Sequence, residues 1–487
     1  SYLEVPAAGA LSQDVLANKV GVEALLVGAY SLLDGEGSSA GTNNGPWATS
    51  SSNWVYGSVA GGDAHKGSDP GDQNLITPIE QWNATASNAY LDQLWQQRYD
   101  GVQRANETLR VMKLAKDISA ADVTRISAEA RFLRAHYHFD LAKFFGNIPY
   151  IDESITYAAG NYLVPNGGKD AALAKIEADM AYAYANLPEA MSSVGRANKW
   201  AAGAYLAKTY LYQNKFTEAA TVLEDLINNG PYRLLTSAEY PNMFERDWEN
   251  NAESVFEIQY SDVDGGSYDC FQCLEGNYSV YFNGPRGFED ATGKFDAGYS
   301  FNVPTQEVVD AFEPGDLRFE TSILDIKQYI IDHPGSKYKE TEGYEQTGYF
   351  NRKYMARKGD LNIGDAALTN PDNYRAIRFA DVLLMAAEAL NRKPSPDDER
   401  ARVYLNRVRN RALLGNITTS GPNLTNDIYK ERRVELVGEG HRFFDLVRTG
   451  KAPQEIDGFV AGKHELFPIP IEEINLSGNR WSQNPNY

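Results

Sequence analysis

Cysteine is scarce in this sequence of 487 residues, with Cys270 and Cys273 as its two members. Two thiolates cannot close a tetrahedral zinc site, and the sequence offers no second pair to complete one. No strand–helix–strand pattern surrounds them, which argues against a thioredoxin-like redox site. A short loop disulfide and two free thiols both remain open.

Basic charge is also in short supply. The chain has 46 Lys plus Arg against 66 Asp plus Glu, a formal net charge of −20. Such a surface repels phosphate backbones, so nucleic-acid binding is excluded, and anionic membranes are poor partners. The apolar share of 43% is nevertheless enough for a full globular core and excludes general disorder.

Long apolar runs are absent as well. No stretch of about 18 apolar residues occurs, so no membrane-spanning helix is expected. The chain begins Ser-Tyr-Leu-Glu-Val-Pro, without a charged start or an apolar signal core. This leaves either a cytosolic protein or one whose targeting segment has been trimmed.

The main pattern in the sequence is apolar residues at helical spacing. Apolar residues at helical spacing predict helices over 94–114 and 127–145, the second buried nearly all round, and helical pairs over 198–231 and 376–414. The pair at 198–231 has small residues on its first helix, an aromatic residue and alanines on its second, and a closing Gly-Pro. These are the ingredients of a tetratricopeptide (TPR) unit, so we predict a mainly α fold of TPR-like hairpins.

Two segments differ from the rest in composition. Residues 35–78 are rich in Gly, Ser, Asn and Asp, and residues 261–368 mix Gly and Pro with many aromatic residues. Long loops without regular structure are usually functional or disordered, and this aromatic content argues against disorder. We therefore predict two loop-rich ligand-binding regions, 35–78 and 261–368, on a helical scaffold formed mainly by 1–34, 79–260 and 369–487.

Catalytic and metal motifs fail on their context. Residues 37–41 spell G-x-S-x-G, but no strand precedes them and no helix follows, as a nucleophile elbow requires. His136 and His138 lie two apart on a predicted helix and point to different sides, as core histidines do. Asp262-Val-Asp264 begins like a calcium loop but lacks the closing Glu. No catalytic residue, metal ligand or cofactor is predicted, and structural calcium stays a minor alternative.

Binding chemistry fits the loops better. A sugar presents an apolar C–H face and a rim of hydroxyl groups. Trp and Tyr offer flat apolar faces to the first, and Asp, Asn, Arg and Lys offer directional hydrogen bonds to the second. Both loop-rich regions contain both kinds of side chain. The competing interpretation is that these aromatic residues anchor long loops to the core.

The most distinctive stretch is 431–451, Glu-Arg-Arg-Val-Glu-Leu-Val-Gly-Glu-Gly-His-Arg-Phe-Phe-Asp-Leu-Val-Arg-Thr-Gly-Lys. Its apolar residues recur at three- and four-residue steps, with both charges along the flanks, which predicts a salt-bridged surface helix ended by Gly450. The string also resembles the E-R-R-x-E-L…E-G-x-R-x-x-D-L-x-R block of the SusD/RagB family.

Further blocks of the same family follow in order along the chain. They are Tyr2–Pro6, the early pattern from Asp63 to Asn106, the helix of 128–139 with its Gly146-Asn-Ile-Pro149 exit, the segment 374–389, and the closing Leu466–Pro470 and Asn484–Tyr487. The lipidated cysteine of the family is missing before Tyr2, consistent with a trimmed mature protein. Together these blocks identify the chain as a member of the family.

The resemblance implies a single domain with about four TPR-like hairpins and a loop-rich ligand half. It implies a non-catalytic cell-surface lipoprotein of the outer membrane, which captures an oligo- or polysaccharide and delivers it to a SusC-like TonB-dependent transporter. The alternatives are a TPR-like protein-interaction scaffold and a glycoside hydrolase. By position we expect the glycan contacts to be Trp54, Asp63, Lys66, Trp82, Tyr278, Asn283 and Arg286, with Trp47 and Arg352 in reserve.

Overall fold

The computed structural model describes residues 13–36, 47–156, 160–263, 266–268, 274–339, 343–360 and 363–487. It is 49% helix and 7% strand, which confirms the mainly α prediction. Cys270, Cys273 and the G-x-S-x-G string at 37–41 lie outside the described residues. Of the described helices, none combines the length and the hydropathy needed to cross a bilayer.

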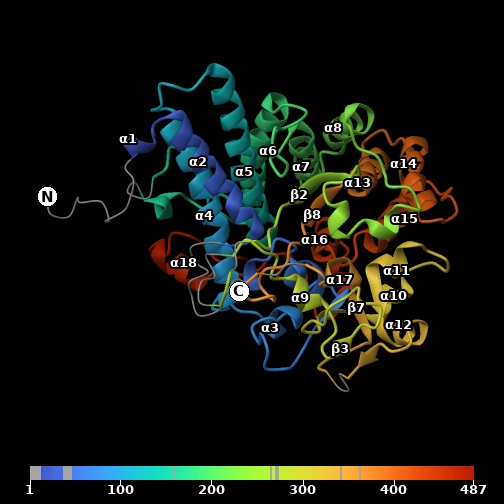
Figure 1. The fold of residues 1–487 in the computed structure, drawn as a ribbon. Coiled ribbons are helices and arrows are strands. Elements are labelled where there is room, and N and C mark those ends of the chain that lie inside the picture. The colour runs from blue at the N-terminus through green and yellow to red at the C-terminus, as the bar shows by residue number, and fades with distance from the viewer. Residues whose placement is uncertain are drawn as a thin grey trace.

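The long helices form an arc across the molecule (Figure 1). In chain order they are α1 (Gln13–Leu16, a short lead-in), α2 (Lys19–Ser31), α4 (Ala89–Met112), α5 (Ala120–Phe145), α6 (Lys169–Asn186), α7 (Lys199–Tyr212), α8 (Phe216–Asn229), α13 (Phe379–Arg392), α14 (Asp398–Arg411), α15 (Gly421–Glu435) and α16 (Arg442–Arg448). From α4 to α8 each helix packs on the next, and α13 continues the series by packing on α8 and α14. The helices predicted over 94–114 and 127–145 and the helical pairs predicted over 198–231 and 376–414 are present.

Local sequence explains why these helices begin, end and pack as they do. The Asn198 side chain accepts a hydrogen bond from the Ala201 amide at 2.8 Å and caps α7. A Cβ at Gly203 would lie 2.9 Å from the Tyr184 ring, so the small residue lets α6 and α7 approach closely. On α8, Phe216, Ala219 and Leu223 are buried against this pair. The predicted hairpin over 198–231 is confirmed.

The loop-rich part lies below the arc in Figure 1 and contains short elements. Its helices are α3 (Thr77–Glu80), α9 (Val280–Asn283), α10 (Gln306–Asp310), α11 (Arg318–Ser322) and α12 (Ile326–Asp332), and near the C-terminus lie α17 (Ala452–Glu455) and α18 (Ile471–Leu476). The strands pair antiparallel as β1 (Ala64–Gly67) with β4 (Phe301–Pro304), β2 (Ser254–Ile258) with β8 (Tyr374–Arg378), β3 (Phe288–Glu289) with β6 (Lys337–Tyr338), and β5 (Ile323–Asp325) with β7 (Tyr349–Asn351). The β1–β4 pair joins the two loop-rich segments to each other.

The stretch 431–451 differs from its prediction in two ways. It is not one helix, because α15 ends at Glu435 and α16 starts at Arg442. Gly438 and Gly440 have φ of 76° and 77° between them, and a Cβ at Gly440 would lie 1.8 Å from the Ser52 carbonyl oxygen. The break therefore lets the loop at 52–57 reach the chain here. The stretch is also not a surface helix, since Glu431, Arg432 and Glu435 are buried.

These buried charges belong to an ion-pair network, which we call the central charge network. Arg378 contacts Glu253 at 2.8 Å, Glu435 at 2.9 Å and Glu439 at 2.8 Å. Glu435 also contacts Arg411 at 2.5 Å and Arg318 at 3.0 Å. Lys353 completes the network by contacting Glu439 at 2.7 Å. Of the pairs predicted within 431–451, Asp445 contacts Arg432 at 3.1 Å and Arg448 at 2.8 Å. The partners of Glu435 come from outside the stretch, and the predicted surface environment was wrong.

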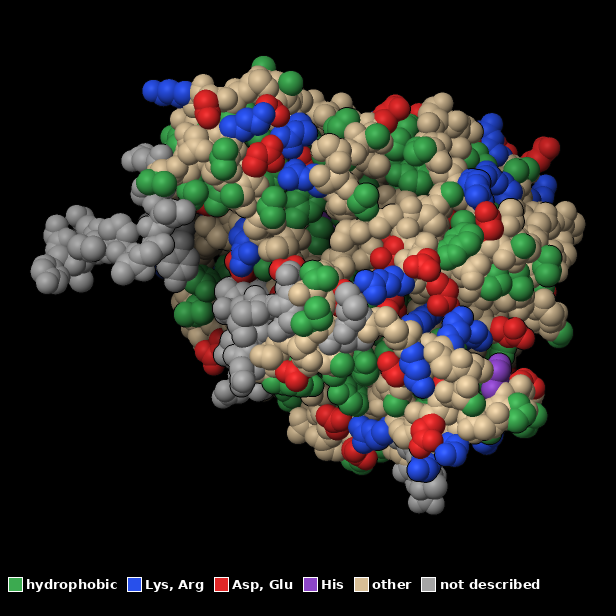
Figure 2. Space-filling view, viewed as in Figure 1, with side chains coloured by type: hydrophobic (Ala, Val, Ile, Leu, Met, Phe, Trp, Pro, Cys, Tyr) green, Lys and Arg blue, Asp and Glu red, His purple; other side chains and the backbone are tan. Residues whose placement is uncertain are grey.

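On the face drawn in Figure 2, the charged side chains are not sorted by sign. On the face seen in Figure 2, acidic and basic side chains are interspersed with apolar ones. Many charged side chains form ion pairs, both in the central charge network and at exposed positions such as Lys337 and Glu289, which are 3.1 Å apart. This face therefore offers no single strongly charged field that would select a partner by charge alone.

We expect Glu435→Gln to lower the free energy of unfolding at pH 7 by about 3–5 kcal/mol, since it leaves buried arginines without their shared carboxylate. Chemical denaturation would measure this. The matched change Glu289→Gln removes an exposed charge and should have little effect. Equal losses in the two variants would contradict a structural role for the network.

The same variant gives a prediction for pH. Burial opposes ionisation of Glu435, but Arg411, Arg378 and Arg318 outweigh it and hold its pKa well below the ordinary value. A carboxyl whose pKa is lowered by folding adds stability above its unfolded pKa of about 4.3, and this is lost as pH falls through the folded pKa. The stability gap between wild type and Glu435→Gln should therefore be constant from pH 7 to about 5 and shrink below pH 4. A gap that widens on acidification would contradict it.

Candidate functional site

Most of the aromatic side chains predicted to contact a glycan lie inside the core. Trp54 is 2% exposed and packs on Phe282 and Phe301, with ring centroids 5.4 and 5.9 Å away. Trp82 is 8% exposed and stacks against His464 at 5.1 Å. Tyr278 is buried as well. In this conformation these rings offer no face to a surface ligand, and they anchor the loops from beneath.

The predicted polar contacts are mostly buried too, and each has partners within the protein. Asp63 contacts Arg433 at 2.7 Å. Lys66 donates from its Nζ to the carbonyl oxygens of Gly67 at 3.1 Å and Asp69 at 2.7 Å. Asn283 donates to the Ser279 carbonyl oxygen at 2.9 Å. Their polar groups hold loops together, because a buried polar group must be paired.

Three of the predicted residues are partly open to solvent. Arg352 is half-buried, with its guanidinium 5.4 Å from the Phe295 ring centre. The Arg286 side chain is 37% exposed and contacts Asp69 at 2.5 Å. Trp47 is half-buried at the start of a 3-10 turn, Trp47–Thr49. Arg286 and Trp47 lie at the edges of the surface described next.

Four aromatic side chains form an open surface, which we call the tyrosine–tryptophan surface: Trp47, Tyr268, Tyr281 and Tyr299. Tyr268 is 50% exposed and Tyr299 36% exposed, and the other two are half-buried. Trp47 lies 6.4 Å from Tyr268, and Tyr281 lies 6.3 Å from Tyr299, between ring centroids. The buried Phe282 joins the two pairs, with its ring 5.4 Å from Trp47 and 6.2 Å from Tyr299.

Two glycines place the tyrosines side by side. The Tyr299 amide donates to the Tyr281 carbonyl oxygen at 2.8 Å, and the Ser300 amide donates to that of Gly284 at 2.8 Å. A Cβ at Gly298 would lie 2.5 Å from the Gly284 backbone, so only glycine permits this approach. The two backbone segments therefore lie side by side, which makes Tyr281 on α9 and Tyr299 just before β4 neighbours on the surface.

Polar groups lie at the edge of this surface. Arg286 donates from Nη2 to the Ser68 hydroxyl at 2.7 Å, and Asp72 lies 3.5 Å from the same guanidinium. The Tyr268 amide donates to the Asp365 carboxylate at 3.0 Å. Burial, with the neighbouring Tyr299, raises the pKa of Tyr268 to about 12, so its phenol stays protonated at neutral pH. Flat apolar rings beside charged hydrogen-bonding groups suit a sugar ring.

Tyr268, Tyr281 and Tyr299 belong to the aromatic residues that the sequence places over 261–368, but none of the three was among the predicted glycan contacts. Their spacing carries no periodic signal, and the sequence could not separate an exposed Tyr299 from a buried Tyr278. Gly284 and Gly298 were the available clue, because a close backbone approach requires residues without a side chain.

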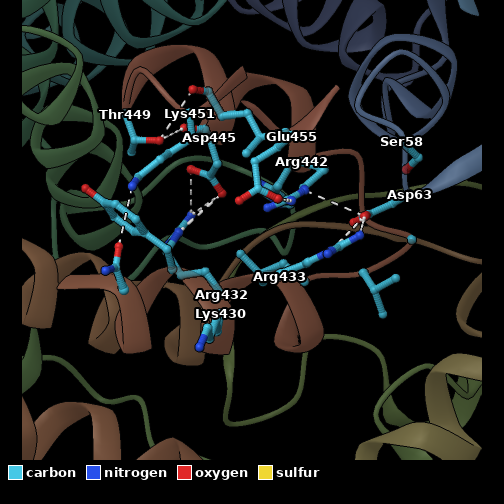
Figure 3. A pocket seen from close by; sticks show the side chains of 17 residues that line it. Ser58, Asp63, Lys430, Arg432, Arg433, Arg442, Asp445, Thr449, Lys451 and Glu455 are labelled. Carbon is cyan, nitrogen blue, oxygen red and sulfur yellow. Dashed lines mark hydrogen bonds and ion pairs between the residues drawn. The ribbon is translucent and has the colours of Figure 1, made fainter. Parts of the chain in front are cut away.

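Apart from this surface, a recess lies between α15, α16, α17 and the segment 58–63 (Figure 3). It has a volume of about 340 Å³. Two ion pairs lie in its lining: Arg433 contacts Asp63 at 2.7 Å, and Arg442 contacts Glu455 at 3.0 Å. Tyr429 is the one Trp, Tyr or Phe residue among the described residues that line it. This recess is therefore less suited to a sugar face than the tyrosine–tryptophan surface.

The predicted calcium alternative falls partly outside the described residues, which do not include Asp264. Asp262 is buried and contacts Arg246 at 3.2 Å, so its carboxylate already has a cationic partner. Among the described residues, a different group, formed by His65, Glu80 and Glu345, brings one possible ligand atom of each residue within 4.8 Å of the others.

Comparison with known proteins agrees with this architecture. Residues 248–465 match the family model described as the SusD family, and residues 41–211 match one described as starch-binding and associating with the outer membrane. SusD-like protein P2 of Formosa agariphila is 29% identical over 443 residues, covering 86% of this chain and 85% of the relative.

Solved structures extend the match to nearly the whole chain. A laminarin binding SusD-like protein is 32% identical, with 96% of this chain and 100% of that chain covered and a TM-score of 0.85. Surface glycan-binding protein A from Bacteroides thetaiotaomicron, solved with laminarihexaose, is 25% identical over 96% of this chain and 100% of that chain, with a TM-score of 0.82. The chain therefore belongs to the SusD family of non-catalytic glycan-binding proteins.

Proposed function

We propose that this protein is a surface glycan-binding protein whose ligand lies across the tyrosine–tryptophan surface. The observation that carries the proposal is the exposure of Tyr268 and Tyr299 beside Trp47 and Arg286, where buried neighbours hold the rings in place. Rings fixed before binding lose little conformational entropy when a sugar stacks on them. Aromatic faces bind the C–H side of the sugar, and Arg286, Asp72 and Asp365 hydrogen-bond its hydroxyl groups.

Laminarin-type glucans are the ligand class to test first. The relatives at 32% and 25% identity are named for laminarin binding and solved with laminarihexaose. A surface with several rings suits a chain of sugars, because neighbouring rings can stack on neighbouring sugar units. The proposal therefore includes higher affinity for laminarihexaose than for glucose.

The proposal also covers the setting in the cell. A match to a family described as associating with the outer membrane supports a protein held there, and we include an N-terminal lipid anchor and a TonB-dependent transporter as partner. Affinity purification of the full-length protein from outer membranes, followed by mass spectrometry, tests both. Recovery of a lipid-modified N-terminus with a TonB-dependent transporter is the expected result. Recovery of unrelated proteins alone would favour the TPR-like interaction scaffold.

We expect Tyr268→Ala and Trp47→Ala each to weaken laminarihexaose binding at least tenfold, about 1.4 kcal/mol, through loss of a stacking face. Isothermal titration calorimetry would measure the affinity, and retardation in native gels containing laminarin would extend it to the polymer. Tyr210→Ala serves as the matched control, since Tyr210 is a half-buried tyrosine on α7 of the helical scaffold. If the control loses as much affinity as Tyr268→Ala, the ligand lies elsewhere.

Affinity should be nearly independent of pH between 6 and 9. Burial raises the pKa values of Tyr268 and Tyr281 to about 12, so both phenols keep their protons throughout this range. Calorimetry at pH 6, 7.5 and 9 should give dissociation constants within about twofold of each other. A change of tenfold would show that another titrating group contacts the glycan.

A further inference from the structure

Three side chains from separate parts of the chain meet beside β1: His65 on β1, Glu80 at the end of α3, and Glu345 in the segment before β7. One ligand atom from each, an imidazole nitrogen or a carboxylate oxygen, lies within 4.8 Å of the others. The residues are 15 and 265 positions apart in sequence, so only the fold brings them together. We propose that they form a site for a first-row divalent metal ion such as Zn²⁺.

The hydrogen bonds around the three residues engage some of their ligand atoms and leave others without a partner. The Lys66 amide donates to Glu80 Oε1 at 3.1 Å, and His65 Nδ1 lies 3.2 Å from the same oxygen. Oε2 of Glu80 and Oε2 of Glu345 are both buried and have no hydrogen-bond partner among the described residues. A buried carboxylate oxygen without a partner is costly, and a metal ion would satisfy both oxygens at once.

Charge at the site also favours a cation. Glu80 and Glu345 each bring a carboxylate oxygen within 4.8 Å of the other, and two negative charges at that distance repel each other. Lys66 donates its Nζ hydrogen bonds to the carbonyl oxygens of Gly67 and Asp69. A divalent ion between the two glutamates would offset their mutual repulsion.

The ligand set selects the metal. One imidazole nitrogen and two carboxylate oxygens suit zinc and its first-row neighbours better than calcium, which takes six to eight oxygen ligands. Ligands bound to zinc at about 2.0–2.2 Å lie roughly 3.3 Å apart, so rotamer shifts of an ångström or two would complete the site. Three protein ligands leave a fourth position for water.

A metal ion bound here would link separate segments of the loop-rich part to one another. Glu345 lies beside Tyr344, whose amide donates to the Ser68 carbonyl oxygen at 2.9 Å, and Gln346 donates to that of Ser300 at 3.1 Å. Ser68 and Ser300 also hold Arg286 at the edge of the tyrosine–tryptophan surface. A metal here would fix β1, α3 and the 343–348 segment together under that edge.

Calorimetric titration of Zn²⁺ into chelator-treated, dialysed protein tests the site without any glycan. We expect one equivalent to bind to wild type, and Glu345→Gln and His65→Gln each to weaken binding at least tenfold. Glu307→Gln is the matched control: it also removes a negative charge that acts on His65, but Glu307 is exposed and outside the group of three. Its affinity should stay within about twofold of wild type.

Two results would overturn the proposal: no zinc binding by wild type, or equal binding by wild type and Glu345→Gln. Circular dichroism checks that each variant is folded. Should a variant unfold, wild type alone decides the matter through modification of His65 by diethyl pyrocarbonate, mapped by mass spectrometry. Zinc should protect His65, and unchanged modification would show that His65 with Glu80 is an ion pair and no more. Since the readouts involve no sugar, they stand apart from the glycan proposal.

Discussion

The central charge network is the constraint on which the other parts of this structure depend. Arg378 is the last residue of β8, Glu435 is the last of α15, Glu253 precedes β2, and Glu439 lies in the break between α15 and α16. Lys353 and Arg318 belong to the loop-rich part and connect it to the network through Glu439 and Glu435. Buried charges tolerate few arrangements, because each must keep its partners or carry a large desolvation cost. The network therefore fixes how the helical arc and the loops meet.

Order in the loop-rich half comes from anchors and short strand pairs. The β1–β4 pair joins residues that are more than two hundred positions apart, and Trp54 packs on both Phe282 and Phe301. These contacts leave Tyr268 and Tyr299 exposed on a fixed base. A ligand surface on loops is thus held by a core that is built mostly from helices, which is how loop positions can vary while a fold is kept.

The metal proposal and the glycan proposal concern neighbouring parts of this base. Ser68 accepts from the Tyr344 amide through its carbonyl oxygen and from Arg286 through its hydroxyl, so it contacts both the segment of Glu345 and the edge of the tyrosine–tryptophan surface. A clamp at His65, Glu80 and Glu345 would reduce the motion of that edge. The two sites use different chemistry, since one needs charge and the other needs flat apolar faces.

Periodicity in the sequence determined the helices, because apolar residues at helical spacing report which face is buried wherever a helix forms. The hairpin at 198–231 and the buried helix ending at Phe145 were predicted in this way, whereas the family blocks were found by their resemblance to known motifs. The sequence also showed that residues 431–451 pair charges. It could not show that Glu435 and Arg378 meet in the interior, since their partners come from distant segments.

The tertiary structure alone decided which aromatic and polar residues of the loops face solvent. Trp54, Trp82 and Tyr278 look no different in sequence from Trp47, Tyr268 and Tyr299, yet the first three are buried and the others are partly open. Asp63 and Lys66 likewise have partners that no local pattern reveals. In irregular segments the exposure of a side chain depends on contacts with residues far along the chain, whereas in a helix the backbone repeat itself fixes which side chains share a face.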